Sequence, residues 1–401
     1  MMKKLTATDA VFIGLAAMLG AGVFVVFGPA AALAGAWFPV AIALAGLVAY
    51  LNAATIAQLA AVVTRSGGTY AYGRHYLGNT WGFLAGASFL VGKIGSAAAI
   101  ALTFANYLTP DSPILTAAFS VVVMAAINIA GINRTAFGSK VLATITIGFL
   151  AVLILAALFS APAHSPLPAG DPVGIFGAAA LFFFAFAGYA RVATLGGEVE
   201  SSEKNVPRAI RISLAIVFAI YLALGLLLSL KLGGELGNSL TPLADLATHS
   251  LNGVSPLSIS PFAAVAALGS LLALLAGMSR TAAEMASDGE LPRLLASKIR
   301  TGAPAMAEIL ISFLVILLVL SGSILLTIGL SSFAILSYYA IANLAAYRQP
   351  AVESSRPKWL NLAGLVLCVG LALSVPPAGL LLGFAILFLA LFLRWGLRVL
   401  R

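Results

Sequence analysis

Apolar runs of about 20 residues follow one another along almost the whole chain, and this pattern constrains the fold more than any other feature. A helix needs about 20 mostly apolar residues to cross the hydrocarbon core of a bilayer. Hydrophobic residues make up 61% of the 401 residues and charged residues only 9%, whereas soluble domains carry about 25% charged residues on their surfaces. We therefore predict an all-α integral membrane protein embedded in a lipid bilayer. Its twelve transmembrane helices are expected near residues 9–33, 37–62, 80–107, 113–131, 139–160, 174–197, 207–230, 258–286, 304–325, 327–347, 358–375 and 378–396, and the longest gap, 231–257, is expected to be a loop.

Basic residues lie almost wholly on one side of these predicted helices. Lys3 and Lys4 precede the first helix, Arg293 and Lys298 follow the eighth, and only Lys231 falls in the loops of the other side. Lys and Arg near the ends of spans stay in the cytoplasm. We therefore expect a multi-pass protein of the cytoplasmic (inner) membrane with both termini cytoplasmic. The net charge of +9 is then a signal of topology, and nucleic-acid binding is not expected.

Two predicted helices, the first and the sixth, are interrupted by glycine. The first contains Gly14, Gly20 and Gly22, and the sixth contains Gly188 shortly after Phe184. Five helices separate these two breaks, so the two helices cross the membrane in opposite directions. Glycine-interrupted spans at corresponding places indicate an inverted repeat with a binding site at the bilayer midplane. Free N–H groups at such a break hold a carboxylate, and free carbonyls hold a cation. The alternative, that small residues only permit close helix packing, is less favoured because the breaks are paired.

Six short motifs occur in order along the chain. They are residues 20–24 (GAGVF), 66–72 (SGGTYAY), 184–188 (FAFAG), 198–210 (with EVE and NVPRAI), 279–292 (with SR and DGELP) and 338–343 (YYAIAN). Together they resemble the motifs of amino-acid permeases of the amino acid–polyamine–organocation (APC) superfamily, and the resemblance covers nearly the whole chain.

The resemblance implies a leucine-transporter type of fold, with helices 1–5 (residues 1–160) and helices 6–10 (174–347) as inverted repeats and accessory helices 11 and 12 in 358–401. It also implies alternating access, with the substrate carboxylate on the backbone amides of Gly20 to Gly22. The substrate amino group is expected on carbonyls of an unwound stretch from Phe184 to Ala187, with Phe184 as an aromatic gate. The predicted substrate-binding residues are Ala17, Gly20, Ala21, Gly22, Phe184, Ala185, Phe186, Ala187 and Gly188.

Two basic residues within the predicted spans, Lys93 and Arg191, are singled out as candidates. A charge in the bilayer costs about 2.5–3.5 kcal/mol on insertion scales, so each is a functional candidate. The structural alternative for Lys93 is bonding to helix-end carbonyls. For Arg191 it is a salt bridge to Glu198 or snorkelling of the side chain into an inner vestibule. Proton-coupled members of the resembled family often carry a lysine midway along the fifth helix, where this chain has Thr146.

Because Thr146 replaces this lysine, three interpretations of how transport is coupled to an ion remain open. Lys93 carries a coupling proton, because burial disfavours the charged form of a lysine. Alternatively, a sodium ion binds between carbonyls of the first helix and hydroxyls such as that of Ser270, near Thr146. In the third interpretation the protein is an uncoupled exchanger. We favour the proton on Lys93.

The residues around the two breaks are small and apolar, which favours a neutral amino acid as substrate. The single cysteine, Cys368, excludes a disulfide framework. The sequence contains no nucleophile–base arrangement, metal-ligand cluster or phosphate loop, so neither an enzyme nor a cofactor nor a metal is expected. We interpret the chain as a secondary transporter of a small or apolar amino acid. The alternatives are a sodium-coupled or uncoupled carrier of another small organic amine, and a membrane sensor that has lost transport.

Overall fold

The computed structural model describes residues 5–20, 22–63, 67–131, 136–163, 165–193, 199–251, 255, 258–300 and 302–399. Within these ranges the chain is helical, and the only strand-type pairing is an isolated bridge between Leu5 and Val199. The prediction of an all-helical protein is therefore confirmed for the described part of the chain.

Every predicted span coincides with at least one helix. Ten spans contain one helix each, and these helices are α4 (Phe38–Val62), α6 (Asn79–Leu108), α7 (Pro113–Ile129), α8 (Ala136–Phe159), α11 (Ser202–Leu232), α13 (Ser260–Ser287), α14 (Ala305–Val319), α15 (Ile324–Arg348), α16 (Lys358–Leu373) and α17 (Pro377–Val399). The first predicted span divides into α1 (Ala7–Met18), α2 (Gly22–Val25) and α3 (Phe27–Ala34), and the sixth into α9 (Gly174–Phe186), a 3₁₀ turn at Ala187–Tyr189, and α10 (Ala190–Ala193).

Length and composition identify this fold as a multi-pass membrane protein. Seven of the described helical segments are long and apolar enough to cross a membrane, and five shorter apolar helices coincide with the remaining predicted spans. The outward-facing side chains of these helices are apolar, such as Leu115 (74% exposed), Phe119 (68%) and Phe388 (74%). Hydrocarbon is the only solvent in which such a surface is favourable.

Two further helices, α5 (Thr69–Leu77) and α12 (Pro242–Ser250), lie between predicted spans. The expectation of a loop over 231–257 does not hold, because α12 occupies its centre. Pro242 stands in the first turn of α12. A proline is favourable there, because the N–H groups of the first turn make no hydrogen bond within the helix. Leu243 and Leu246 are fully buried, and burial of this apolar face on α8 and α11 stabilises the short helix.

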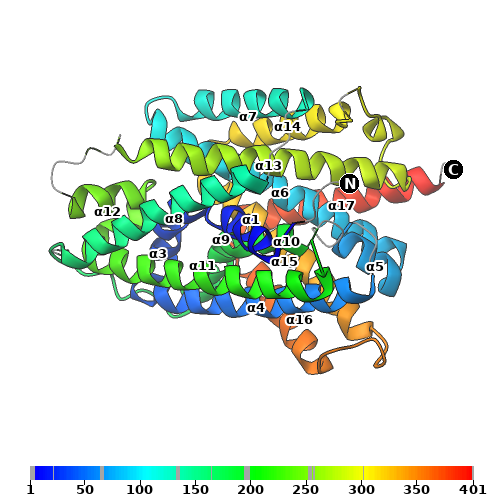
Figure 1. Cartoon of the computed structure of the whole chain (residues 1–401), viewed down its shortest axis with the longest axis horizontal. Coiled ribbons are helices and arrows are strands. Elements are labelled where there is room, and N and C mark those ends of the chain that lie inside the picture. Colours follow the sequence, from blue (N-terminus) through cyan, green and yellow to red (C-terminus); the bar gives the residue numbers. More distant parts are fainter. Residues whose placement is uncertain are drawn as a thin grey trace.

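The helices run side by side along the longest axis of the molecule (Figure 1). In this view α5 and α12 lie at opposite ends, and α17 ends in the half that contains α5. The discontinuous elements α1, α9 and α10 lie near the centre of the view. α1 packs against α11 and α8, and α9 packs against α4, α3 and α15. The two interrupted helices are therefore enclosed by continuous ones.

Candidate functional site

The first break separates α1 from α2 and contains Gly20. α1 ends at Met18, and the N–H of its capping residue Leu19 donates to the Leu15 carbonyl. The backbone resumes a helical path at Gly22. Ala21, which the sequence also predicts as a substrate-binding residue, lies outside the described residues.

The second break is tighter than the sequence suggests. The chain remains α-helical through Phe186 and then forms the 3₁₀ turn at Ala187–Tyr189. The N–H of Ala187 donates to the carbonyls of Phe183 and Phe184. The expectation of an unwound stretch from Phe184 to Ala187 therefore does not hold, because the 3₁₀ turn satisfies carbonyls that an open backbone would leave free.

Glycines bring the two breaks into direct contact. A Cβ atom on Gly22 would lie 2.9 Å from the Cα atom of Ala185, and one on Gly188 would lie 2.4 Å from the carbonyl oxygen of Ala17. Both distances are too short for a side chain, and in each case the obstacle is backbone, so the two positions require glycine. Four of the predicted substrate-binding residues thus lie against one another. The Phe184 ring is also close, 3.4 Å from the same Gly22 Cβ position.

Tyr221 joins the two breaks and was not predicted from the sequence. It is fully buried on α11, and its hydroxyl lies 2.6 Å from the carbonyl oxygen of Met18 and 3.2 Å from that of Ala185, donating toward both. Met18 is the last residue of α1, and Ala185 stands in the last turn of α9. Carbonyls at a helix end lack an intrahelical donor, and Tyr221 supplies one. The available signal in the sequence was a phenol within the otherwise apolar run 214–228, since a buried hydroxyl needs a partner.

Ser270 lies directly at the first break. A Cβ atom on Gly20 would lie 2.2 Å from the Ser270 Oγ atom, so this hydroxyl of α13 occupies the space that a side chain would need. Thr146 is buried on α8, a helix that packs against both α1 and α13. Lys140, one and a half turns earlier, pairs with Asp9 at the start of α1, with 2.5 Å between Nζ and Oδ1.

Lys93 is buried on α6, with 9% of its surface exposed. Within the described residues its ammonium group has no hydrogen bond or ion pair, so the alternative of bonds to helix-end carbonyls finds no support in that part of the chain. One turn further along α6, Ser96 bonds to Ser331 of α15 at 2.8 Å. Arg191 belongs to α10, but its side chain and Glu198 lie outside the described residues, so the Arg191–Glu198 salt bridge stays a prediction.

Aromatic rings cluster beside the second break. Tyr189 and Tyr339 are fully buried, with ring centroids 5.4 Å apart, and Phe183 meets Tyr339 edge-on at 5.6 Å. Tyr338 packs edge-on against Tyr339 at 5.1 Å. These rings join α9 and the 3₁₀ turn to α15 and close the space beside the break.

Residues 5–395 match the family model described as amino acid permease. The chain belongs to this family. Uncharacterized transporters of Mycobacterium bovis and Mycobacterium tuberculosis are 41% identical to the permease over 392 residues, covering 96% of this chain and 89% of each relative. The resemblance to the APC superfamily is thus confirmed, and the permease is a transporter.

Similarity to the permease also extends to relatives with named substrates. Cationic amino acid transporter 6, chloroplastic, of Arabidopsis thaliana is 30% identical over 249 residues, or 54% of this chain and 43% of the relative. The methylthioribose transporter of Bacillus subtilis is 26% identical over 323 residues, or 73% and 69% of the two chains. The family therefore includes transporters of different small molecules.

A buried ion-pair network joins α5, α17 and the residues that follow α13. Glu290, just after α13, accepts two bonds from Arg394 of α17, at 2.6 and 3.1 Å, and one from Arg74 of α5, at 3.2 Å. Beside it, the Tyr70 hydroxyl donates to Asp288 at 2.8 Å. Sequence reasoning missed this network because Glu290 stands 104 positions from Arg394 and 216 from Arg74.

Proposed function

We propose that the permease is a secondary active transporter that moves a small or apolar neutral amino acid across the cytoplasmic membrane by alternating access. In this proposal both termini are cytoplasmic. Residues 1–160 and 174–347 form two inverted repeats, and 358–401 adds two accessory helices. The proposal is supported by the order of the helices, because each proposed repeat opens on a discontinuous helix, α1–α3 in the first and α9–α10 in the second.

The contact between the two breaks is the observation that carries the proposal. In this proposal the α-carboxylate of an amino acid binds at the start of α2, where the positive end of the helix dipole and the backbone amides of Gly20 and Gly22 suit a negative charge. Ala17, Ala185 and Ala187 contribute only methyl groups beside them, which suits a small apolar substrate side chain. Phe184, against Gly22, is positioned to act as the aromatic gate in this scheme.

Lys93 carries the coupling proton in our proposal. A buried ammonium without a counter-charge is unfavourable in the hydrocarbon region. In this proposal Lys93 is neutral at rest and becomes protonated when a substrate carboxylate enters the site. Binding of proton and amino acid is then cooperative, as symport requires.

A second candidate is sodium coupling at Ser270. The observation that favours it is the closeness of the Ser270 hydroxyl to the Gly20 backbone. Hydroxyl and carbonyl oxygens at a broken helix are the ligands that transporters use for sodium. Thr146 belongs to the same candidate because α8 packs on α1 and α13.

Uptake into proteoliposomes tests these proposals. The purified permease is supplied with radiolabelled neutral amino acids under an imposed proton gradient, a sodium gradient, or neither. Accumulation driven by the proton gradient is expected. Accumulation driven only by sodium would favour the Ser270 site, and exchange without either gradient would favour an uncoupled carrier. Specific binding in a thermal-shift assay without any flux would identify a sensor.

The Lys93→Met variant tests the coupling residue. Downhill exchange of substrate is expected to continue, whereas accumulation under a proton gradient and its pH dependence are expected to be lost. Lys231→Met is the matched control, because Lys231, at the end of α11, is equally buried (8% exposed) but donates to the carbonyl of Ser160, which directly follows α8. Unchanged pH dependence in Lys93→Met would exclude Lys93 as the proton carrier.

Competition distinguishes a neutral substrate from a cationic one. Alanine or leucine is expected to compete with the label, whereas arginine is not. Strong competition by arginine alone would indicate a cationic amino acid, the substrate class named for the Arabidopsis relatives. It would contradict the neutral-substrate proposal.

A further inference from the structure

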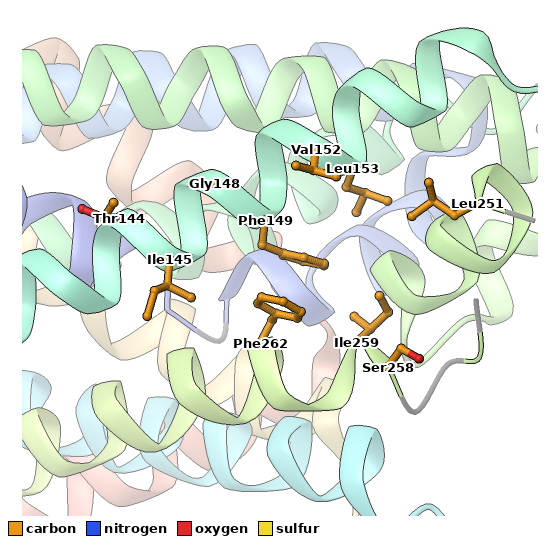
Figure 2. Close-up of a pocket in the computed structure, with 10 residues that line it drawn as sticks. All are labelled: Thr144, Ile145, Gly148, Phe149, Val152, Leu153, Leu251, Ser258, Ile259 and Phe262. Atoms are coloured by element: carbon orange, nitrogen blue, oxygen red, sulfur yellow. The ribbon is translucent and has the colours of Figure 1, made fainter. Parts of the chain in front are cut away.

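An apolar pocket lies between α8 and the start of α13 (Figure 2). Its volume is about 520 Å³, within the range of about 300–1,000 Å³ typical of small-molecule sites. Ile145, Phe149 and Val152 of α8 face Ile259 and Phe262 across it. A ligand in this pocket would therefore meet almost only hydrocarbon surface.

The pocket opens on the surface that faces the lipid. Its rim residues Ile145, Val152 and Phe262 are 41%, 59% and 37% exposed. The neighbouring outward side chains of α8, such as Leu155 and Phe159, are also apolar and exposed. In a membrane-spanning permease this surface is in contact with acyl chains, which are present at high concentration there. A polar occupant would find few partners among the described lining residues, of which only Thr144 and Ser258 offer hydroxyls.

Stacked rings connect the pocket to the first break. Phe262 and Phe149 are nearly parallel, with centroids 4.7 Å apart, and Phe149 in turn stacks at 6.2 Å on Phe24 of α2. Phe24 is fully buried, and its carbonyl accepts a bond of 2.9 Å from the Tyr107 hydroxyl. The pocket wall therefore contacts α2, the short helix that begins at Gly22, through the Phe149 ring.

We propose that an acyl chain of a membrane phospholipid occupies the pocket between α8 and α13 and, through the stacked rings of Phe149 and Phe24, stabilises this position of α2. The chain buries its methylene groups against Ile145, Val152 and Phe262. It thereby holds the Phe149 ring against Phe24.

Photolabelling in liposomes tests the binding site. The probe is phosphatidylglycerol with a diazirine near the end of its palmitoyl chain, and labelled peptides are mapped after illumination. Enrichment is expected in residues 144–153 and 258–262 over the lipid-facing peptides of α16. Equal labelling of both regions would overturn the proposal.

Gly148→Leu fills the pocket without displacing the protein, because a Cβ atom at Gly148 would meet nothing within 4 Å. Labelling of the pocket peptides is expected to fall by about tenfold or more, since each methylene kept from burial weakens binding about fourfold. Gly370→Leu on α16 is the matched control, because the space beside Gly370 is equally open. Unchanged labelling in Gly148→Leu would refute the site. If that variant aggregates in gel filtration, Val152→Phe fills the same space from the rim.

Phe149→Leu tests the connection to α2. It keeps the wall apolar but removes the ring stack, so pocket labelling is expected to persist. Added phosphatidylglycerol is expected to raise the melting temperature of the wild type and to leave that of Phe149→Leu unchanged. A rise that persists in Phe149→Leu would refute the connection while leaving the binding site intact.

Discussion

Replacement of Tyr221 by phenylalanine isolates the bond that joins the two breaks. The change removes one hydroxyl and keeps the ring, which packs against Phe186 at 4.9 Å and Phe27 at 6.3 Å between centroids. After the change the Met18 and Ala185 carbonyls both lose the donor that now lies at 2.6 and 3.2 Å. Packing of the core is otherwise preserved.

The size of the effect follows from those two contacts. A buried hydrogen bond contributes about 1 kcal/mol net, and a buried acceptor left without a donor costs about 1–3 kcal/mol. The Met18 carbonyl, at 2.6 Å, carries most of the effect. We therefore expect this conformation to lose about 1–3 kcal/mol, which corresponds to about 5–150-fold in its equilibrium with other conformations.

Thermal unfolding and initial uptake rates in proteoliposomes measure this loss. The melting temperature of Tyr221→Phe is expected to fall, and its uptake kinetics are expected to change about fivefold or more. Tyr50→Phe is the control, because Tyr50 of α4 is 48% exposed on the outer surface and undergoes the same chemical change. A Tyr221→Phe protein with the melting temperature and uptake of the wild type would refute the reasoning. A Tyr50→Phe variant affected to the same extent would refute it too.

Three further predictions concern other parts of the permease. Gly188→Ala is expected to lose about 1–3 kcal/mol of stability, because the added methyl group overpacks against the backbone of α1. The control Gly370→Ala, with open space beside it, is expected to keep the melting temperature of the wild type. Glu290→Gln leaves the buried Arg394 without its carboxylate and is expected to cost about 3–5 kcal/mol in denaturant unfolding; a loss no larger than that of an exposed pair would contradict the network. Burial raises the pKa of the Asp245 carboxyl on α12, so wild-type stability is expected to fall as pH rises from the ordinary aspartate range through the raised pKa. Asp245→Asn should accordingly melt above the wild type near neutral pH, and the difference should vanish in acid.

The membrane-spanning helices were predictable from the sequence because their cause is local. The bilayer requires every backbone N–H and C=O of a span to be bonded within the protein. A run of about 20 apolar residues such as 37–62 has one solution, a helix. The interruption at Gly20 was predictable for the same reason, since glycine weakens a helix wherever it stands. The helix α12 was missed because its apolar face is short and gains stability only from neighbouring helices.

The contacts within the candidate site depend on which helices are neighbours, and no local pattern specifies that. Tyr221 stands 203 positions from Met18, and its role appears only once α11 packs against α1 and the 3₁₀ turn. The second break closed into a 3₁₀ turn instead of unwinding, with Gly188 against the Ala17 carbonyl and the Tyr221 hydroxyl near that of Ala185. The sequence by itself determined that the chain crosses a membrane many times and breaks its first helix at glycine. Only the tertiary structure decided which hydroxyls, carbonyls and rings meet at the breaks, because hydrogen bonds and ring contacts require atoms within a few ångströms and those atoms come from distant parts of the chain.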